Sequence, residues 1–312
     1  SGIVDTAFSA PVSGSNNYVY ALVRVGNALY VGGSFSFISG VARANLAKID
    51  ALTGAVDPAF QADTDNTVQA LSVFGSLLYV GGQFSLIKGS NRVDVARVDL
   101  SSGTVDPAFS PVVDGQIRSF ASDGTNLYVG CAFSTFGGFS KLRLVKIDAA
   151  SGTVDNSFSP NPDGWVWVLR LDGNDLYVGG DFLNIAGQAY AHGVRLNKLT
   201  GVLDTTFAPN PTLAVDAIAV DASKVWLGGN FDKVAGQARL RLARVNKSDG
   251  SVDSFNPSAG GTVYVLESNG STMLIGGLLS SYGGYARNRV AKINARTGQV
   301  DPGFNAEVPT LV

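Results

Sequence analysis

Short apolar runs separated by turns follow one another along the whole chain, and the same order of runs returns about every fifty residues. In one unit the runs cover residues 68–73, 77–84, 95–99 and 105–109. They are rich in Val, Tyr, Phe and Leu and are bounded by Gly, Ser and Asn, which predicts four β-strands, here called strands A to D. No window shows a sustained helical period, so the expected fold is all-β.

A Leu-Tyr-Val-Gly-Gly-x-Phe motif in strand B fixes the register of the repeats. Its copies are spaced by 49 residues four times and by 48 residues once, counted from the residue at its second position. These six residues are Tyr30, Tyr79, Tyr128, Tyr177, Trp226 and Leu274. A fixed period of about 50 residues with four strands per unit is typical of a β-propeller blade. The sequence therefore predicts a six-bladed β-propeller with four antiparallel strands per blade.

We expect a single domain over residues 1–312, because one four-stranded sheet cannot bury both faces alone, whereas six sheets around an axis bury each face against a neighbour. The predicted blades cover residues 18–60, 67–109, 116–158, 165–207, 214–255 and 262–304. The first five residues match Ser102-Gly103-Thr104-Val105-Asp106, which gives seven D segments for six A-B-C sets. We therefore expect residues 1–9 to supply an extra D strand that closes the ring, and the chain to be part of a longer polypeptide.

The composition of the chain limits the kinds of partner that we expect it to bind. Charged residues make up 15% of the chain and the net charge is −2, so we expect no general attraction to nucleic acid or to membranes. The longest apolar runs have the length of a strand, and none is long enough to span a bilayer. The single cysteine, Cys131, replaces the second Gly of the motif and is expected to be a buried small residue. Few Lys, few Cys and many Gly, Ser, Thr and Asn residues suit an exported bacterial surface protein, which predicts an extracellular or cell-surface location.

The aligned units read apolar-x-Ala-Leu, Leu-Tyr-Val-Gly-Gly-x-Phe, Gly-x-x-Arg, Leu-Ala-Lys-Ile-Asp, Thr-Gly and Val-Asp-Pro-Ala-Phe. This pattern resembles the bacterial delta-60 propeller repeats and is similar to the repeats of fungal cortical polarity-marker ectodomains. The resemblance covers nearly the whole chain. It implies a propeller in large exported or surface proteins, and it supplies no catalytic residues.

Two charged positions recur in every unit. A base lies in the middle of strand C, and an Asp opens strand D. The bases are Lys48, Arg97, Lys146, Arg195, Arg244 and Lys292, and the acids are Asp57, Asp106, Asp155, Asp204, Asp253 and Asp301. A charge repeated in all units indicates architecture, so we expect pairing across the C–D hairpin or capping of its turn. The Gly-Gly pairs are expected to admit the adjacent blade, since no helix follows that would favour phosphate binding.

Catalytic and metal-binding patterns are weak. The oxygen-rich run from Asp63 to Asn66 lacks the Gly and the distal Glu of an EF-hand, which favours a solvated turn. His192 has no Cys or His at metal-ligand spacing and is interpreted as a loop histidine. Neither a cofactor nor a metal is predicted. An enzyme, most naturally a glycoside hydrolase or lyase, would need two converging carboxylates, and nothing pairs Asp216 with the loop acids Asp65, Asp114 and Asp163.

One position of strand A departs from the repeat and supplies the candidate ligand site. It holds Tyr20, Gln69, Arg118, Trp167, Asp216 and Tyr264, with Trp165 two residues before Trp167. In a propeller these side chains would surround the long-loop mouth of the central channel. Aromatic rings beside Arg, Asp and Gln suit a polar ligand with an apolar face, such as a sugar or a peptide tip. The alternative is that the rings plug the channel and that Arg118 pairs with Asp216.

The long loops also carry a repeated basic position, for which loop-bracing is favoured over a collar for anionic polysaccharide. Its residues are Arg43, Arg92, Lys141, Arg239 and Arg287. The sequence therefore predicts a non-catalytic binding, scaffold or adhesion module with a protein or glycan ligand at the bacterial surface. A lectin-like, carbohydrate-binding propeller is the alternative.

Overall fold

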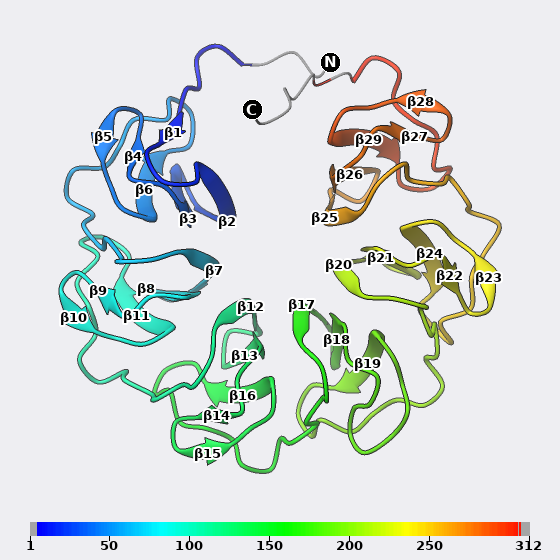
Figure 1. The fold of residues 1–312 in the computed structure, drawn as a ribbon, viewed down its shortest axis with the longest axis horizontal. Coiled ribbons are helices and arrows are strands. Elements are labelled where there is room, and N and C mark those ends of the chain that lie inside the picture. Colours follow the sequence, from blue (N-terminus) through cyan, green and yellow to red (C-terminus); the bar gives the residue numbers. More distant parts are fainter. Residues whose placement is uncertain (1–4, 305, 307–312) are drawn as a thin grey trace. The chain divides into compact units, whose positions relative to one another are not determined.

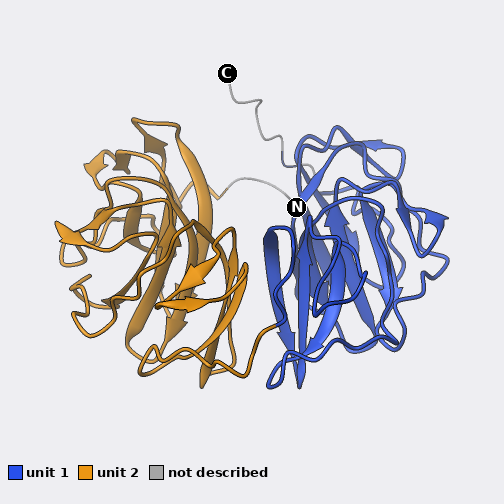
Figure 2. Cartoon of the chain, turned by 60° about the horizontal axis from the view of Figure 1, so that its bottom comes forward, with its two compact units in different colours: residues 1–4, 160–312 blue, residues 5–159 orange. Residues whose placement is uncertain are grey.

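The computed structural model describes residues 5–304 and 306, and within them it contains strands and loops but no helix. The chain divides into two compact units (Figure 2). The N-terminal unit is Asp5–Ser159, and the described part of the C-terminal unit begins at Pro160. Each unit contains three copies of the repeat, and each copy forms one antiparallel sheet in the strand order A-B-C (Figure 1).

The three sheets of the N-terminal unit follow the predicted runs closely. They are β2 (Tyr18–Val25), β3 (Ala28–Ser34) and β6 (Leu46–Asp50); β7 (Val68–Phe74), β8 (Leu77–Gly82) and β11 (Val95–Asp99); and β12 (Ile117–Ser122), β13 (Asn126–Cys131) and β16 (Leu144–Asp148). Those of the C-terminal unit are β17 (Val166–Asp172), β18 (Asp175–Gly180) and β19 (Gly193–Asn197); β20 (Val215–Val220), β21 (Lys224–Gly229) and β24 (Leu242–Asn246); and β25 (Val263–Ser268), β26 (Thr272–Gly277) and β29 (Val290–Asn294).

The prediction of a fourth strand in each blade is wrong. The D segment forms one bridge to strand C, as between Val98 and Val105, and the ladder then ends. Asp106 stops it because its carboxylate accepts a hydrogen bond from the Ala108 N–H at 2.8 Å, which turns the chain, and Pro107 has no N–H to donate. Residues 1–4 of the predicted closing strand lie outside the described residues, and Phe8 packs against the apolar cluster of the first repeat.

The B–C loops contain short hairpins that the sequence pattern did not predict. They are β4 (Phe37–Ile38) with β5 (Val41–Ala42), β9 (Leu86–Ile87) with β10 (Ser90–Asn91), β14 (Thr135–Phe136) with β15 (Phe139–Ser140), β22 (Lys233–Val234) with β23 (Gln237–Ala238), and β27 (Ser281–Tyr282) with β28 (Tyr285–Ala286). In the first repeat, β1 (Val12–Ser13) extends such a hairpin by pairing with β4. One buried apolar residue, such as Ile87, fixes each hairpin to the core.

Neighbouring sheets within a unit pack through strand A of the later sheet. A Cβ added to Gly32 would lie 2.6 Å from a methyl carbon of Val68, and Gly81 has the same relation to Ile117. Real Cβ atoms do not approach that closely, so the first Gly of each such pair is needed for the adjacent strand to fit. This confirms the predicted packing role of the Gly-Gly pairs. Cys131 is fully buried, as expected from its place in the motif.

The repeated charges form the predicted pairs and also connect successive sheets. Arg97 lies 2.6 Å from the Asp106 carboxylate across the C–D turn. The same guanidinium donates to the Ala150 carbonyl in the C–D turn of the next repeat at 2.6 Å, and the Tyr79 hydroxyl donates to the neighbouring Ala149 carbonyl at 2.5 Å. Equivalent base–acid pairs occur in all six repeats. The ion pairs therefore belong to the architecture.

Candidate functional site

The variable position of strand A is a β-bulge. The pairing of β7 with β8 shifts register between Val68 and Ala70, so that Gln69 has no partner in the ladder. The same shift occurs in every repeat, and the bulged residues are the six predicted ones: Tyr20, Gln69, Arg118, Trp167, Asp216 and Tyr264. A bulged residue lies outside the register of the ladder, and the bend redirects its side chain. The bulge therefore explains both why the residue type can vary and why this position is suited to binding.

In the N-terminal unit the structure brings three of the predicted residues onto adjacent strands. Strand β7 lies between β2 and β12, and these strands carry Gln69, Tyr20 and Arg118 respectively. The Tyr20 ring is 52% exposed and lies 5.8 Å from the ring of Tyr18. Within the described residues the buried Oε1 of Gln69 has no hydrogen-bond partner. Exposed aromatic surface and a buried acceptor without a partner therefore lie on adjacent strands.

In the C-terminal unit the remaining four predicted residues lie on or beside β17, β20 and β25, which are also adjacent. The rings of Trp165 and Trp167 meet edge to face, with centroids 4.9 Å apart. Trp165 is 39% exposed and Tyr264 is 48% exposed. Asp216 is half-buried on the strand between them. Aromatic rings thus flank a carboxylate on a single face of this unit.

The repeated basic loop residues are braces, as predicted. Arg92 donates from Nε to the Phe109 carbonyl at 3.0 Å, and the Lys141 ammonium donates to the Phe158 carbonyl at 2.8 Å. Lys141 is almost completely buried. Arg92 also donates from Nη2 to the carbonyl of the D-segment Asp, and Arg43, Arg239 and Arg287 make this same Nη2 contact. The buried Nε of Arg43, Arg239 and Arg287 has no hydrogen-bond partner among the described residues. With their charge directed at backbone carbonyls, these residues do not form an exposed basic collar.

The acids of the D–A loops are also structural. Asp65 accepts backbone hydrogen bonds from Ser85 and Leu86 at 2.8 and 2.9 Å. Burial raises the pKa of Asp114, but hydrogen bonds from Ser134 and Thr135 outweigh it and lower that pKa to about 2. Such a carboxylate stays ionised near neutral pH and cannot donate a proton. Across the described residues, no group of three His, Cys, Asp or Glu could hold a metal ion.

His192 occupies a left-handed loop position, with φ of 63°. It is buried, and its Nδ1 lies 2.9 Å from the Pro211 carbonyl oxygen. Asn45 holds the same position in the first repeat, where its amide donates to the Thr64 carbonyl at 2.9 Å. The interpretation of His192 as a loop histidine is confirmed.

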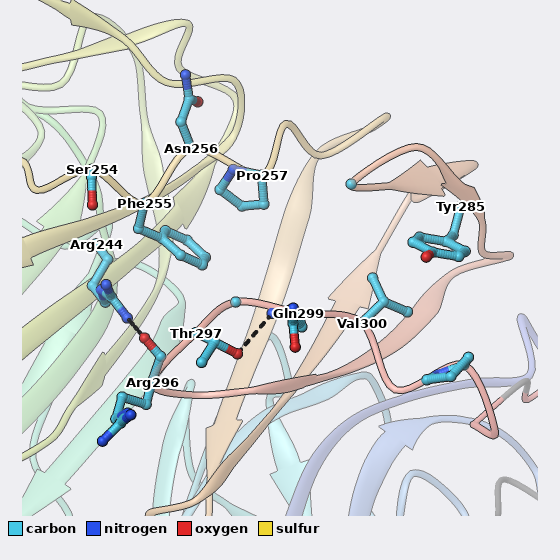
Figure 3. A pocket seen from close by; sticks show the side chains of 13 residues that line it. Arg244, Ser254, Phe255, Asn256, Pro257, Tyr285, Arg296, Thr297, Gln299 and Val300 are labelled. Carbon is cyan, nitrogen blue, oxygen red and sulfur yellow. Dashed lines mark hydrogen bonds between the residues drawn. The ribbon is translucent and has the colours of Figure 1, made fainter.

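The C-terminal unit contains a hollow of about 730 Å³ that the sequence pattern did not predict (Figure 3). It lies between the D segment of the fifth repeat, around Phe255, and the C–D turn of the sixth, around Gln299. The available signal was the single spacing of 48 residues, because the fifth repeat has one residue fewer between Asp253 and Phe255 than the other repeats have.

These sheets and their repeated contacts define a β-propeller repeat protein. The family described as "Domain of unknown function (DUF5122) beta-propeller" matches residues 27–60, 76–109, 174–207, 224–255 and 267–304. These segments make up more than half of the chain, which therefore belongs to this family. The resemblance to delta-60 propeller repeats is consistent with that family.

Solved structures share the fold at low sequence identity. The computationally designed Ika8 protein has a TM-score of 0.60 and 16% identity, over 94% of this chain and 76% of that one. The WD40 β-propeller domain of Doa1 has a TM-score of 0.59 and 12% identity, over 95% and 84%. The extracellular domain of the hybrid two-component system BT4673 from B. thetaiotaomicron has a TM-score of 0.53 and 16% identity, over 93% and 32%.

No curated protein matches the chain. Within the described residues, no helix is long and apolar enough to cross a membrane.

Proposed function

We propose that the six repeats close into one propeller and that the protein is a non-catalytic binding module whose ligand contacts the bulged residues of strand A. Support comes from the contrast between this position and the rest of the repeat. Six units that share one packing scheme hold five residue types at the bulge. The residue before the bulge is apolar in all six repeats and fully buried in five of them, as at Val68 and Val215, whereas Val19 of the first repeat is 43% exposed.

The tryptophan pair is the observation that carries the proposal. Trp165 and Trp167 pack edge to face, yet more than a third of the Trp165 surface remains exposed. Exposed indole surface is unfavourable in water, and a ligand that covers it gains the hydrophobic contribution. The Trp165 carbonyl accepts a hydrogen bond from the Asp181 N–H at 3.0 Å, which holds the residue in place. A rigid aromatic surface binds with little loss of side-chain entropy.

A non-catalytic role fits the state of the loop carboxylates. Asp114 is held ionised by its hydrogen bonds, and Asp163 has a lowered pKa because bonds from Asn184 and Leu183 outweigh the effect of burial. A glycosidase needs one carboxyl group with a raised pKa to protonate the leaving group. Neither of these acids meets that requirement.

Carbohydrate is the second candidate ligand, and exposed rings beside a carboxylate favour it. Sugar rings stack their apolar faces on aromatic side chains, while their hydroxyls donate to carboxylates. Tyr264 and Asp216 offer that combination on adjacent strands. We also propose an extracellular or cell-surface location, in line with the low charge of the chain and with the shared fold of the BT4673 extracellular domain.

The test is to screen the whole chain against a glycan array and a panel of surface peptides, and then to measure the affinity of variants for the ligand found. Trp167→Ala and Arg118→Ala should each lose about 1–3 kcal/mol of binding free energy. Leu199→Ala, which truncates an exposed side chain in a C–D turn, is the matched control and should bind as wild type. Wild-type affinity in both bulge variants would place the site elsewhere.

A further inference from the structure

The hollow of the C-terminal unit has a smaller counterpart in the N-terminal unit. A hollow of about 310 Å³ lies between the second and third repeats and is lined by the aligned residues. Phe109, Phe139, Gly152, Thr153 and Val154 there correspond to Phe255, Tyr285, Gly298, Gln299 and Val300 in the larger one. The groove therefore recurs between repeats, and the version between the fifth and sixth repeats is the larger of these two.

The enlargement coincides with a local change in the sequence. The fifth repeat reads Asp253-Ser254-Phe255 where the second reads Asp106-Pro107-Ala108-Phe109. This shortening of the D segment coincides with a hollow of about 730 Å³, within the size range of small-molecule sites. The lining is also more polar, since Tyr, Gln and Asn replace Phe, Thr and Ser at three aligned positions. The larger volume leaves room for a ligand, and the polar lining favours a ligand with hydrogen-bonding groups.

The floor of the hollow is fixed. The Phe255 ring meets the Trp226 ring edge to face, with centroids 4.9 Å apart, and the Arg244 guanidinium lies 4.7 Å from the Phe255 centroid. Arg244 also donates to the Arg296 carbonyl at 2.7 Å, which ties the C–D turn to the floor (Figure 3). Gly298 completes the wall, because a Cβ at that position would overlap the Phe255 ring. A site held in this way is preformed and needs little ordering on binding.

The lining offers an aromatic face, hydroxyl and amide groups, and the guanidinium of Arg296 at one edge. Tyr285 is 53% exposed, and Arg287 steadies its ring from 5.7 Å. The Thr297 hydroxyl accepts a hydrogen bond from the Gln299 N–H at 3.3 Å and keeps its own proton to donate. Arg244 is neutralised by Asp253 at 2.8 Å, and the Arg296 side chain extends away from Gln299 and Val300 (Figure 3).

We propose that this hollow binds a pyranose unit of a neutral oligosaccharide. The Tyr285 ring stacks on the apolar face of the sugar, while Thr297 and Gln299 form hydrogen bonds with its hydroxyls. The hollow contains none of the bulged strand-A residues, so it is a site distinct from the one proposed above.

The whole chain is tested by saturation-transfer NMR with cellotriose, maltotriose, mannotriose and chitotriose, each at millimolar concentration. At least one trisaccharide should receive saturation, and its affinity is then measured by titration. Tyr285→Ala and Gln299→Ala should each weaken binding about tenfold. Phe139→Ala, at the aligned position of the smaller groove, is the matched control and should change affinity less than about twofold. Both target side chains are exposed, so the variants should keep the wild-type Tm.

Three results would overturn the proposal. The first is that none of the four trisaccharides receives saturation. The second is that Tyr285→Ala and Gln299→Ala bind as wild type. The third is that Trp167→Ala abolishes binding while Tyr285→Ala retains it, which would assign the sugar to the strand-A face. Conversely, loss of binding in Tyr285→Ala with normal binding in Trp167→Ala supports this site independently of the strand-A proposal.

Discussion

Asp94 is an acid at a loop position where other repeats have a side chain that donates a hydrogen bond, as Asn45 and Arg241 do. Asn45 donates to the Thr64 carbonyl, and Arg241 donates to the Ala259 carbonyl at 3.2 Å. All of these residues have φ between 60° and 67°, so the backbone gives the side chain a common direction. An ionised carboxylate has no proton to donate at this position. Burial raises the pKa of Asp94 to about 6, which favours the protonated form in the folded protein.

We predict that the stability of the protein falls as pH rises from about 4 to about 6, because of Asp94. The folded-state pKa lies above the unfolded one, so the folded protein holds the proton over this range and loses the advantage as pH increases. Asp94→Asn should remove this dependence and raise the free energy of unfolding at pH 7.5. Since Asp94 is only half-buried, we expect a gain of about 1 kcal/mol.

The control for this prediction is the reverse change at the aligned position. Asn45→Asp should introduce a loss of stability above pH 6, since Asn45 is buried and its amide makes the native hydrogen bond. Urea unfolding at pH 4.5 and 7.5 measures both variants. An equal effect of Asp94→Asn at the two pH values would exclude the titration of Asp94 as the cause.

At the scale of the element, the C–D turn depends on one carboxylate that has two roles. Asp106 accepts the Ala108 N–H through one oxygen and contacts the buried Arg97 through the other. We predict that Asp106→Ala lowers the free energy of unfolding by about 1–3 kcal/mol, because Arg97 then keeps a buried charge without its partner. Asp106→Asn keeps the turn hydrogen bond and should lose less. Denaturant unfolding compares the two, and equal losses would show that the ion pair contributes nothing.

Strands A to C could be predicted because each has a dense apolar run and a fixed register against the Gly-Gly motif. Strand D could not, since Asp106 and Pro107 stop the ladder after Val105 by hydrogen bonding that an apolar pattern does not record. The short hairpins could not be predicted either, because each has a single buried residue, such as Ile38. One apolar residue cannot show the alternation of apolar and polar positions that marks a strand.

The position of the candidate site could be predicted from the sequence, but the β-bulge that forms it could not. The variability at Gln69 and its equivalents identified the correct position, although the reason for it, a residue outside the register of the ladder, appears only in the strand pairing. The enlarged hollow depends on one missing residue before Phe255 and on contacts between two repeats. The two walls of the hollow, around Phe255 and Gln299, are about forty residues apart in the sequence, so only the fold brings them together.

At the scale of the whole molecule, stability should be shared among repeats through their common contacts. Arg97 donates to the Ala150 carbonyl of the following repeat, and Arg195 donates to the Lys247 carbonyl at 2.5 Å. In a repeat array the stability is approximately a sum of the terms for single units and for their interfaces. Sheets joined by buried bonds of this kind should unfold together within each unit.

If the six repeats close into one propeller, as proposed, the contacts between repeats should make all six unfold together. We predict that thermal unfolding is one transition, with calorimetric and van't Hoff enthalpies in agreement. Asp106→Ala in the N-terminal unit and Asp204→Ala in the C-terminal unit remove equivalent ion pairs. If the ring is closed, each variant lowers the midpoint of the common transition. Two units that unfold independently would instead give two transitions, and each variant would shift only the transition of its own unit, which would contradict closure.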